Sequence, residues 1–235
     1  MPVGLGDEVM WLCPSLDDSP NDLSGNGNNG TYVNGTSTVV DSDPTYGGSR
    51  AYNFDGVDDY IDCGTSVISN TSFSMSCWFN TDTTSGAGSF AGSYHWQAGE
   101  RSFYIRRDYT DVAFLVASNG ASAGGNVQIY STTTVSVGTW YHVTATWDSV
   151  SGEMELFING VSEATGTQSA MAPLAEPLVL GAYSAIPEGL YNGKQDDIRF
   201  FQRVLTQPEI TLLASTRGFT AGGGTHINRT LLGVG

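Results

Sequence analysis

The stretch Phe73-Ser74-Met75-Ser76-Cys77-Trp78-Phe79 decides the fold class of this chain. Every second residue is a large apolar one, and serine fills two of the three positions between them. In an extended strand, alternate residues point to the same face, so this pattern predicts a β-strand at 72–80 with one face in a core.

Similar strand patterns lie on both sides of this stretch. Residues 51–62 are expected to form two strands around an Asp-Gly turn, and residues 153–161 a strand that enters an Asn-Gly hairpin turn. The remaining expected strands are 8–13, 88–94, 101–107, 112–117, 126–131, 140–147, 178–182 and 194–201. Together with 30 glycines, these short strands predict an all-β fold, an antiparallel β-sandwich.

One helix is expected near the end of the chain. In Thr206-Gln207-Pro208-Glu209, threonine takes the N-cap position, proline the first turn and glutamate the position three residues on. This capping box predicts a short C-terminal helix of about two turns.

The character of the sequence changes after Arg217. Residues 218–235 are rich in glycine and end in an apolar segment, so we expect one domain at 1–217 and a C-terminal arm at 218–235. The arm is expected to dock on a neighbouring subunit through its apolar residues, which are Phe219, Ile227, Leu231, Leu232 and Val234.

The charge of the chain restricts its partners. Twenty-four acidic residues against nine Lys and Arg give a formal net charge of −15. Such a surface repels nucleic acid and anionic lipid, and it suits cations, basic protein patches or a neutral glycan. The three cysteines lie in apolar, strand-like contexts, which favours buried free thiols over a disulfide or a metal site.

The order of several motifs resembles the laminin-G-like and pentraxin-like domains of the concanavalin A-like lectin/glucanase superfamily. The matching motifs are Asp22–Gly30, Phe54-Asp55-Gly56-Val57-Asp58-Asp59-Tyr60-Ile61, Phe73–Phe79, Trp140-Tyr141-His142-Val143, Leu156-Phe157-Ile158-Asn159-Gly160, Leu180-Gly181, and Asp196-Asp197-Ile198-Arg199-Phe200 followed by Arg203–Thr206. They run from about residue 8 to about residue 214. The resemblance implies that residues 1–217 form a jelly roll.

A structural calcium ion is one expectation. The early loop offers hard oxygen ligands in Asp22, Asn26 and Asn28. The resemblance implies that Asp196 or Asp197, on the final strand, completes such a site.

Catalysis is not expected. The glucanases of the superfamily carry Glu-x-Asp-x-x-Glu on one strand, and the nearest stretch here is Glu153-Met154-Glu155, which lacks the third acid. We interpret these glutamates as surface charge.

Exposed aromatic rings are the candidates for sugar binding. Rings can stack on sugar faces, and the candidates are Tyr94, Trp96, Tyr109, Tyr183 and Tyr191. The alternative is that these rings are partly buried under loops or form a contact with another protein.

Two functions remain open. The first is a non-enzymatic structural or decoration protein of a large assembly such as a phage or virus particle, a homo-oligomer with capsid or tail partners and surface-glycan adhesion. It fits an N-terminus in which we expect no secretory signal. The second is an extracellular or cell-surface carbohydrate-binding module. No stretch is long and apolar enough for membrane insertion.

Overall fold

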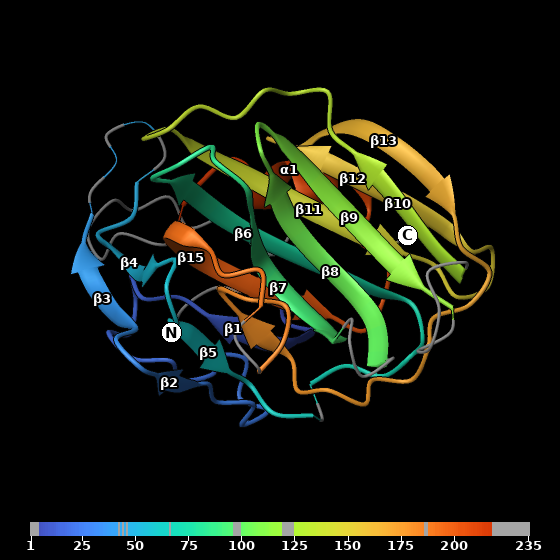
Figure 1. Ribbon diagram of the computed structural model, residues 1–235, viewed down its shortest axis with the longest axis horizontal. Coiled ribbons are helices and arrows are strands. Elements are labelled where there is room, and N and C mark those ends of the chain that lie inside the picture. Colours follow the sequence, from blue (N-terminus) through green and yellow to red (C-terminus); the bar gives the residue numbers. More distant parts are fainter. Residues whose placement is uncertain are drawn as a thin grey trace.

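The computed structural model describes residues 5–41, 43, 45, 47–65, 67–95, 100–118, 125–185 and 188–217. Within these residues the chain forms two antiparallel sheets that stack face to face, with one short helix on the far side of one sheet (Figure 1). The expected all-β jelly-roll sandwich with a short C-terminal helix is confirmed.

The first sheet, sheet A, has eight strands in the order β13-β12-β11-β6-β15-β4-β3, with β1 paired to β15. Its strands are β1 (Glu8–Leu12), β3 (Ser37–Val40), β4 (Arg50–Asp55), β6 (Phe73–Thr81), β11 (Trp140–Trp147), β12 (Glu153–Ile158), β13 (Val161–Thr167) and β15 (Asn192–Phe201).

The second sheet, sheet B, has seven strands in the order β10-β9-β8-β7-β14-β5-β2. Its strands are β2 (Thr31–Val33), β5 (Tyr60–Asp62), β7 (Ala87–His95), β8 (Glu100–Asp108), β9 (Asp111–Ala117), β10 (Asn126–Tyr130) and β14 (Val179–Leu180). The four strands β7 to β10 form the face that is turned toward the viewer in Figure 1.

The core lies between the sheets and follows the alternation of the strands. Phe73, Met75, Cys77 and Phe79 of β6 all lie in this core, as the period-2 pattern predicts. They pack against rings from sheet B, and the Phe73 ring lies 4.9 Å from that of Phe103. The three cysteines are free and buried, as expected.

The helix α1 (Gln207–Leu213) covers the outer face of sheet A. Its N-terminus is capped by Glu209, whose carboxylate accepts the backbone N–H of Thr206 at 2.8 Å. Ile210 and Leu213 pack with Phe157 and Phe201, side chains that β12 and β15 turn away from the core. The capping-box prediction is therefore confirmed.

Three strands were not predicted from the sequence: β2, β3 and β13, which begins where the predicted hairpin segment 153–161 ends. Their side chains are mostly half-buried or exposed, so their sequences carry no apolar alternation. The predicted arm, with Phe219, Ile227, Leu231, Leu232 and Val234, lies outside the described residues. None of the described helices is long and apolar enough to cross a membrane.

Candidate functional site

The outer face of sheet B carries a group of aromatic and basic side chains. On β8, Phe103 and Ile105 enter the core, so Tyr104 and Arg106 point outward. On β10, Ile129 faces the core and Tyr130 therefore also points outward. Strand pairing sets Arg106 and Tyr130 on either side of the small Ala113 of β9. We call Tyr94, Tyr104, Arg106, Tyr130 and Tyr183 the outer-face cluster.

Two of its members come from distant parts of the sequence. The backbone N–H of Tyr94 on β7 donates to the carbonyl of Tyr183 at 2.8 Å. This contact places the two rings 5.5 Å apart, edge to face. The Tyr183 ring is also stacked 5.8 Å from that of Tyr104. Tyr94 and Tyr104 are nearly buried, so the half-buried Tyr183 is the ring of the three that meets solvent most.

The positive charge of the cluster lies over an aromatic ring. The guanidinium of Arg106 sits 4.6 Å from the centre of the Tyr104 ring and pairs with Asp108 at 2.9 Å. Its buried Nε has no hydrogen-bond partner, and the same holds for Nε2 of Gln128. Tyr130 is 46% exposed. Both nitrogens are shielded from solvent, so the surface that the cluster offers to a ligand consists mainly of the exposed parts of its tyrosine rings.

The aromatic residues that were predicted to bind sugar lie in different environments. Tyr94 and Tyr183 come together in the outer-face cluster, whereas Tyr109 lies exposed in the β8–β9 turn with a φ of 56°. The prediction that Tyr191 contacts a ligand is wrong, because this residue is fully buried and its ring packs 5.2 Å from that of Phe90 in the core. It cannot stack on a ligand. Trp96 lies outside the described residues.

The early loop is fastened to β1 by its own polar groups. One carboxylate oxygen of Asp22 accepts the backbone N–H of Trp11 at 2.9 Å, and the other accepts that of Asn28 at 3.0 Å. The side-chain amide of Asn26 donates to the carbonyl of Glu8 at 2.8 Å, and that of Asn28 donates to the carbonyl of Val9. These contacts fasten the loop to β1, and a calcium ion there stays a prediction.

Asp196 and Asp197 are buried beside arginines. Asp197 accepts the Nε–H of Arg199 at 2.8 Å and the indole N–H of Trp11 at 2.6 Å. Asp196 accepts the Ser15 hydroxyl at 2.6 Å and lies 3.4 Å from Arg217. Burial, followed by the charge of Asp197, raises the pKa of Asp196 to about 7. Both carboxylates therefore have arginine partners within the fold, and their part in a calcium site stays a prediction.

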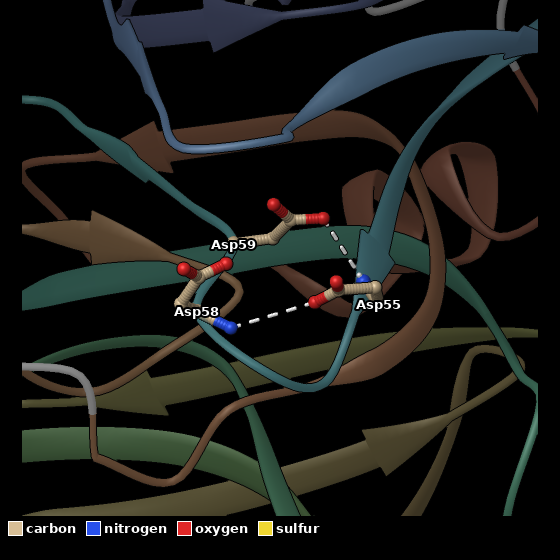
Figure 2. Close-up of side chains that lie close together, drawn as sticks. All are labelled: Asp55, Asp58 and Asp59. Atoms are coloured by element: carbon tan, nitrogen blue, oxygen red, sulfur yellow. Dashed lines mark hydrogen bonds between the residues drawn. The ribbon is translucent and has the colours of Figure 1, made fainter.

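A different group of carboxylates lies together in the turn between β4 and β5. Asp55, Asp58 and Asp59 each offer an oxygen within 4.8 Å of the others, and they are the only such group of three among the described residues. Figure 2 shows the three side chains around the turn. Burial raises the pKa of Asp59, and the charges of Asp55 and Asp58 add to this rise.

The glutamates considered for catalysis lie on the outside of sheet A. Met154 enters the core, so Glu153 and Glu155 on either side of it face outward. Glu155 accepts the hydroxyl of Ser162 on the neighbouring strand β13. This placement agrees with surface charge.

Tyr104, Arg106 and Tyr130 were not predicted from the sequence as ligand contacts. A signal was present for the first two, because Phe103 and Ile105 alternate with them in the strand pattern. For Tyr130 the deciding information is its register across Ala113, which is not local in sequence.

Three solved structures illustrate what the fold resembles. The binding domain of Paraclostridial Mosquitocidal Protein 1 has a TM-score of 0.71 and 18% identity, over 90% of this chain and 52% of that one. Domain 4 of AbnA, a GH43 extracellular arabinanase from Geobacillus stearothermophilus, solved in complex with arabinotriose, has a TM-score of 0.64 and 19% identity, over 88% of this chain and 98% of that one. The botulinum neurotoxin serotype D ligand binding domain, in complex with N-acetylneuraminic acid, has a TM-score of 0.62 and 14% identity, over 89% and 50%.

The chain spans about half the length of the two toxin domains. At these identities the likeness establishes the fold alone. No curated protein matches the chain in sequence. The family described as the concanavalin A-like lectin/glucanases superfamily, Laminin_G_3, matches residues 55–211, which is more than half of the chain. The chain therefore belongs to the Laminin_G_3 family of the concanavalin A-like lectin/glucanase superfamily.

Proposed function

We propose that this chain is a non-enzymatic, lectin-like module that binds a neutral glycan on the outer face of sheet B. The observation that carries this proposal is the outer-face cluster, in which Tyr183 and Tyr130 present rings beside the guanidinium of Arg106. Sugar rings have apolar C–H faces that stack on aromatic side chains, and their hydroxyls pair with fixed donors.

Charge favours a neutral sugar over an acidic one. The net charge of −15 repels anions at long range, and Asp108 already neutralises Arg106. Among the structural neighbours, the arabinanase domain was solved with arabinotriose and the serotype D domain with N-acetylneuraminic acid. A glycan ligand is thus compatible with this fold, and an extracellular location accords with the extracellular arabinanase.

The role in a large assembly remains a prediction. One of its grounds is the arm at 218–235, which lies outside the described residues, and the homo-oligomer and the capsid or tail partners stay predictions as well. The expected virion location also stays a prediction.

A glycan array followed by calorimetry tests the proposal. We expect binding to neutral oligosaccharides, with sialylated ones weaker, and Tyr183→Ala or Tyr130→Ala should weaken affinity about tenfold or more, as for other central aromatic contacts. Tyr130→Ala matters because this half-exposed ring can be removed with little effect on folding.

The matched control is Tyr60→Ala. Tyr60 also points outward from sheet B, since Ile61 enters the core, but it lies on β5, beyond β14 from the cluster. It should bind as the unaltered chain does. Equal losses in all three variants, or no glycan bound at all, would overturn the proposal.

A further inference from the structure

The two rings of the outer-face cluster that meet solvent stand over different strands of sheet B. Tyr183 lies against β7, so closely that a Cβ on Gly92 would stand 2.7 Å from the Cβ of Tyr183. Tyr130 belongs to β10 and is 46% exposed. The order β10-β9-β8-β7 puts three strand intervals between these backbones (Figure 1), which is about 14 Å at the usual spacing. One sugar ring covers about the area of one tyrosine ring, so a single sugar cannot stack on both.

The face between the two rings carries little charge. Strand pairing aligns two rows of outward side chains there, Arg106–Ala113–Tyr130 and Tyr104–Leu115–Gln128. Arg106 is the one charged residue in these two rows, and its guanidinium pairs with Asp108 at 2.9 Å. The whole chain has a formal net charge of −15. On so acidic a protein, a strip with a neutralised charge suits a neutral ligand better than a charged one.

The hydroxyls of both rings are free to bond a polar ligand. Within the described parts of the chain, the hydroxyls of Tyr130 and Tyr183 bond to no protein group. Burial, followed by the charge of Glu188, raises the pKa of Tyr183, so this hydroxyl keeps its proton and can donate. Each ring thus offers an apolar face and a hydrogen-bonding group, which match the C–H face and the hydroxyls of one sugar.

We propose that the outer-face cluster binds a linear neutral oligosaccharide that lies across strands β7 to β10, with one sugar on Tyr183 and another on Tyr130. The sugars between them pass over Arg106, whose charge Asp108 neutralises. A sugar in an extended chain advances by a distance close to one strand interval, so roughly three sugars reach both rings. This inference rests on the proposed function and adds the form of the ligand, a chain rather than a single sugar.

Calorimetry with ladders of linear neutral oligosaccharides, supplemented by NMR titration for the weakest ligands, tests the inference. The probes run from monosaccharide to hexasaccharide in the arabinan, xylan, cellulose and starch series. We expect affinity to rise about tenfold or more from monosaccharide to trisaccharide, because the second aromatic contact is gained over that range. Beyond the tetrasaccharide the affinity should change little.

The main variant is Tyr130→Ala, because this half-exposed ring can be removed with little effect on folding. Its affinity for the trisaccharide should fall about tenfold, whereas that for the monosaccharide should fall no more than about twofold, since a short ligand still has Tyr183. Tyr130→Phe keeps the ring and should keep the rise with chain length. Tyr60→Ala on β5 is the matched control and should behave as the unaltered chain, and equal Tm values establish that the variants fold.

The outcomes separate this inference from the proposed function. Equal affinity for monosaccharide and trisaccharide overturns the chain-shaped ligand but leaves the glycan site standing. Equal weakening of both ligands in Tyr130→Ala, or binding confined to branched glycans on the array, has the same consequence. No binding to any ladder or to the array removes the proposed function as well. An oligomer that Tyr130→Ala dissociates, without glycan binding, would show that this face contacts a second copy of the chain.

Discussion

Replacing Arg199 by methionine tests how the N-terminal strand is held to sheet A. Arg199 lies on β15 and bridges two buried carboxylates, with Nη1 2.9 Å from Glu8 and Nε 2.8 Å from Asp197. Its guanidinium also lies 4.0 Å from the centre of the Trp11 ring. Methionine keeps an apolar stem but removes the charge. Two carboxylate side chains that are 3% and 4% exposed then lose their cation.

Removing one partner of a buried ion pair costs about 3–5 kcal/mol. Glu8 keeps the backbone N–H groups of Leu5 and Gly6, and Asp197 keeps the indole of Trp11. We therefore expect the lower part of the range, a loss of about 3–4 kcal/mol in the free energy of unfolding. For a chain of 235 residues, this corresponds to a fall in Tm of roughly 6–16 °C.

Urea unfolding followed by tryptophan fluorescence measures this loss. The matched control is Arg50→Met, because Arg50 pairs with Asp18 where the side chains are 29% and 54% exposed. Pairs of that kind contribute less than about 1 kcal/mol. If Arg199→Met costs no more than Arg50→Met, the buried pairs do not hold β1 to β15, and the reasoning is refuted.

Two further predictions concern stability. The pKa of Asp196 is raised to about 7 in the fold, mainly by burial, so its contribution to stability is full below its ordinary pKa near 4 and is lost as the pH rises through 7. Asp196→Asn should flatten the decline in unfolding free energy between pH 5 and pH 8, and an unchanged decline would contradict this. Gly181→Ala should lower the Tm by several degrees more than Gly25→Ala. Both glycines have a positive φ, but a Cβ at Gly181 meets the Phe54 ring at 2.4 Å, whereas nothing lies within 4 Å at Gly25. Equal Tm values for the two variants would show that backbone strain alone acts.

Strands with one face in the core were predictable from sequence, whereas two strands at the margins of the sheets, β2 and β3, were not. β6 lies in the middle of sheet A, and its apolar alternation records that burial directly. β2 and β3 end their sheets, so water meets much of their surface and their sequences need no apolar alternation. What places them is hydrogen bonding to β5 and β4, and a backbone ladder leaves little trace in side-chain sequence.

The candidate site residues show the same difference between what local sequence indicates and what long-range contacts decide. Tyr94 and Tyr183 were foreseen as separate aromatic residues, but their contact depends on a backbone bond between segments far apart in sequence. Asp196 lies 3.4 Å from Arg217, an arginine whose approach depends on the path of the chain after α1 and was not predicted. In each case residue type indicated the chemistry, while the identity of the partner required the fold.

The outer faces of the two sheets differ in how much aromatic surface is left free to contact a ligand. On sheet A, α1 covers Phe157 and Phe201, and Arg217 is fully buried with its guanidinium 4.0 Å from the Trp140 ring centre. The aromatic rings on this face already pack against α1 or Arg217. A ligand would have to displace these partners, and displacing Arg217 would break its buried ion pairs. On sheet B, Tyr130 and Tyr183 keep part of their surface in water. A ligand can therefore add contacts to sheet B without breaking any, and this asymmetry is the physical reason for placing recognition there.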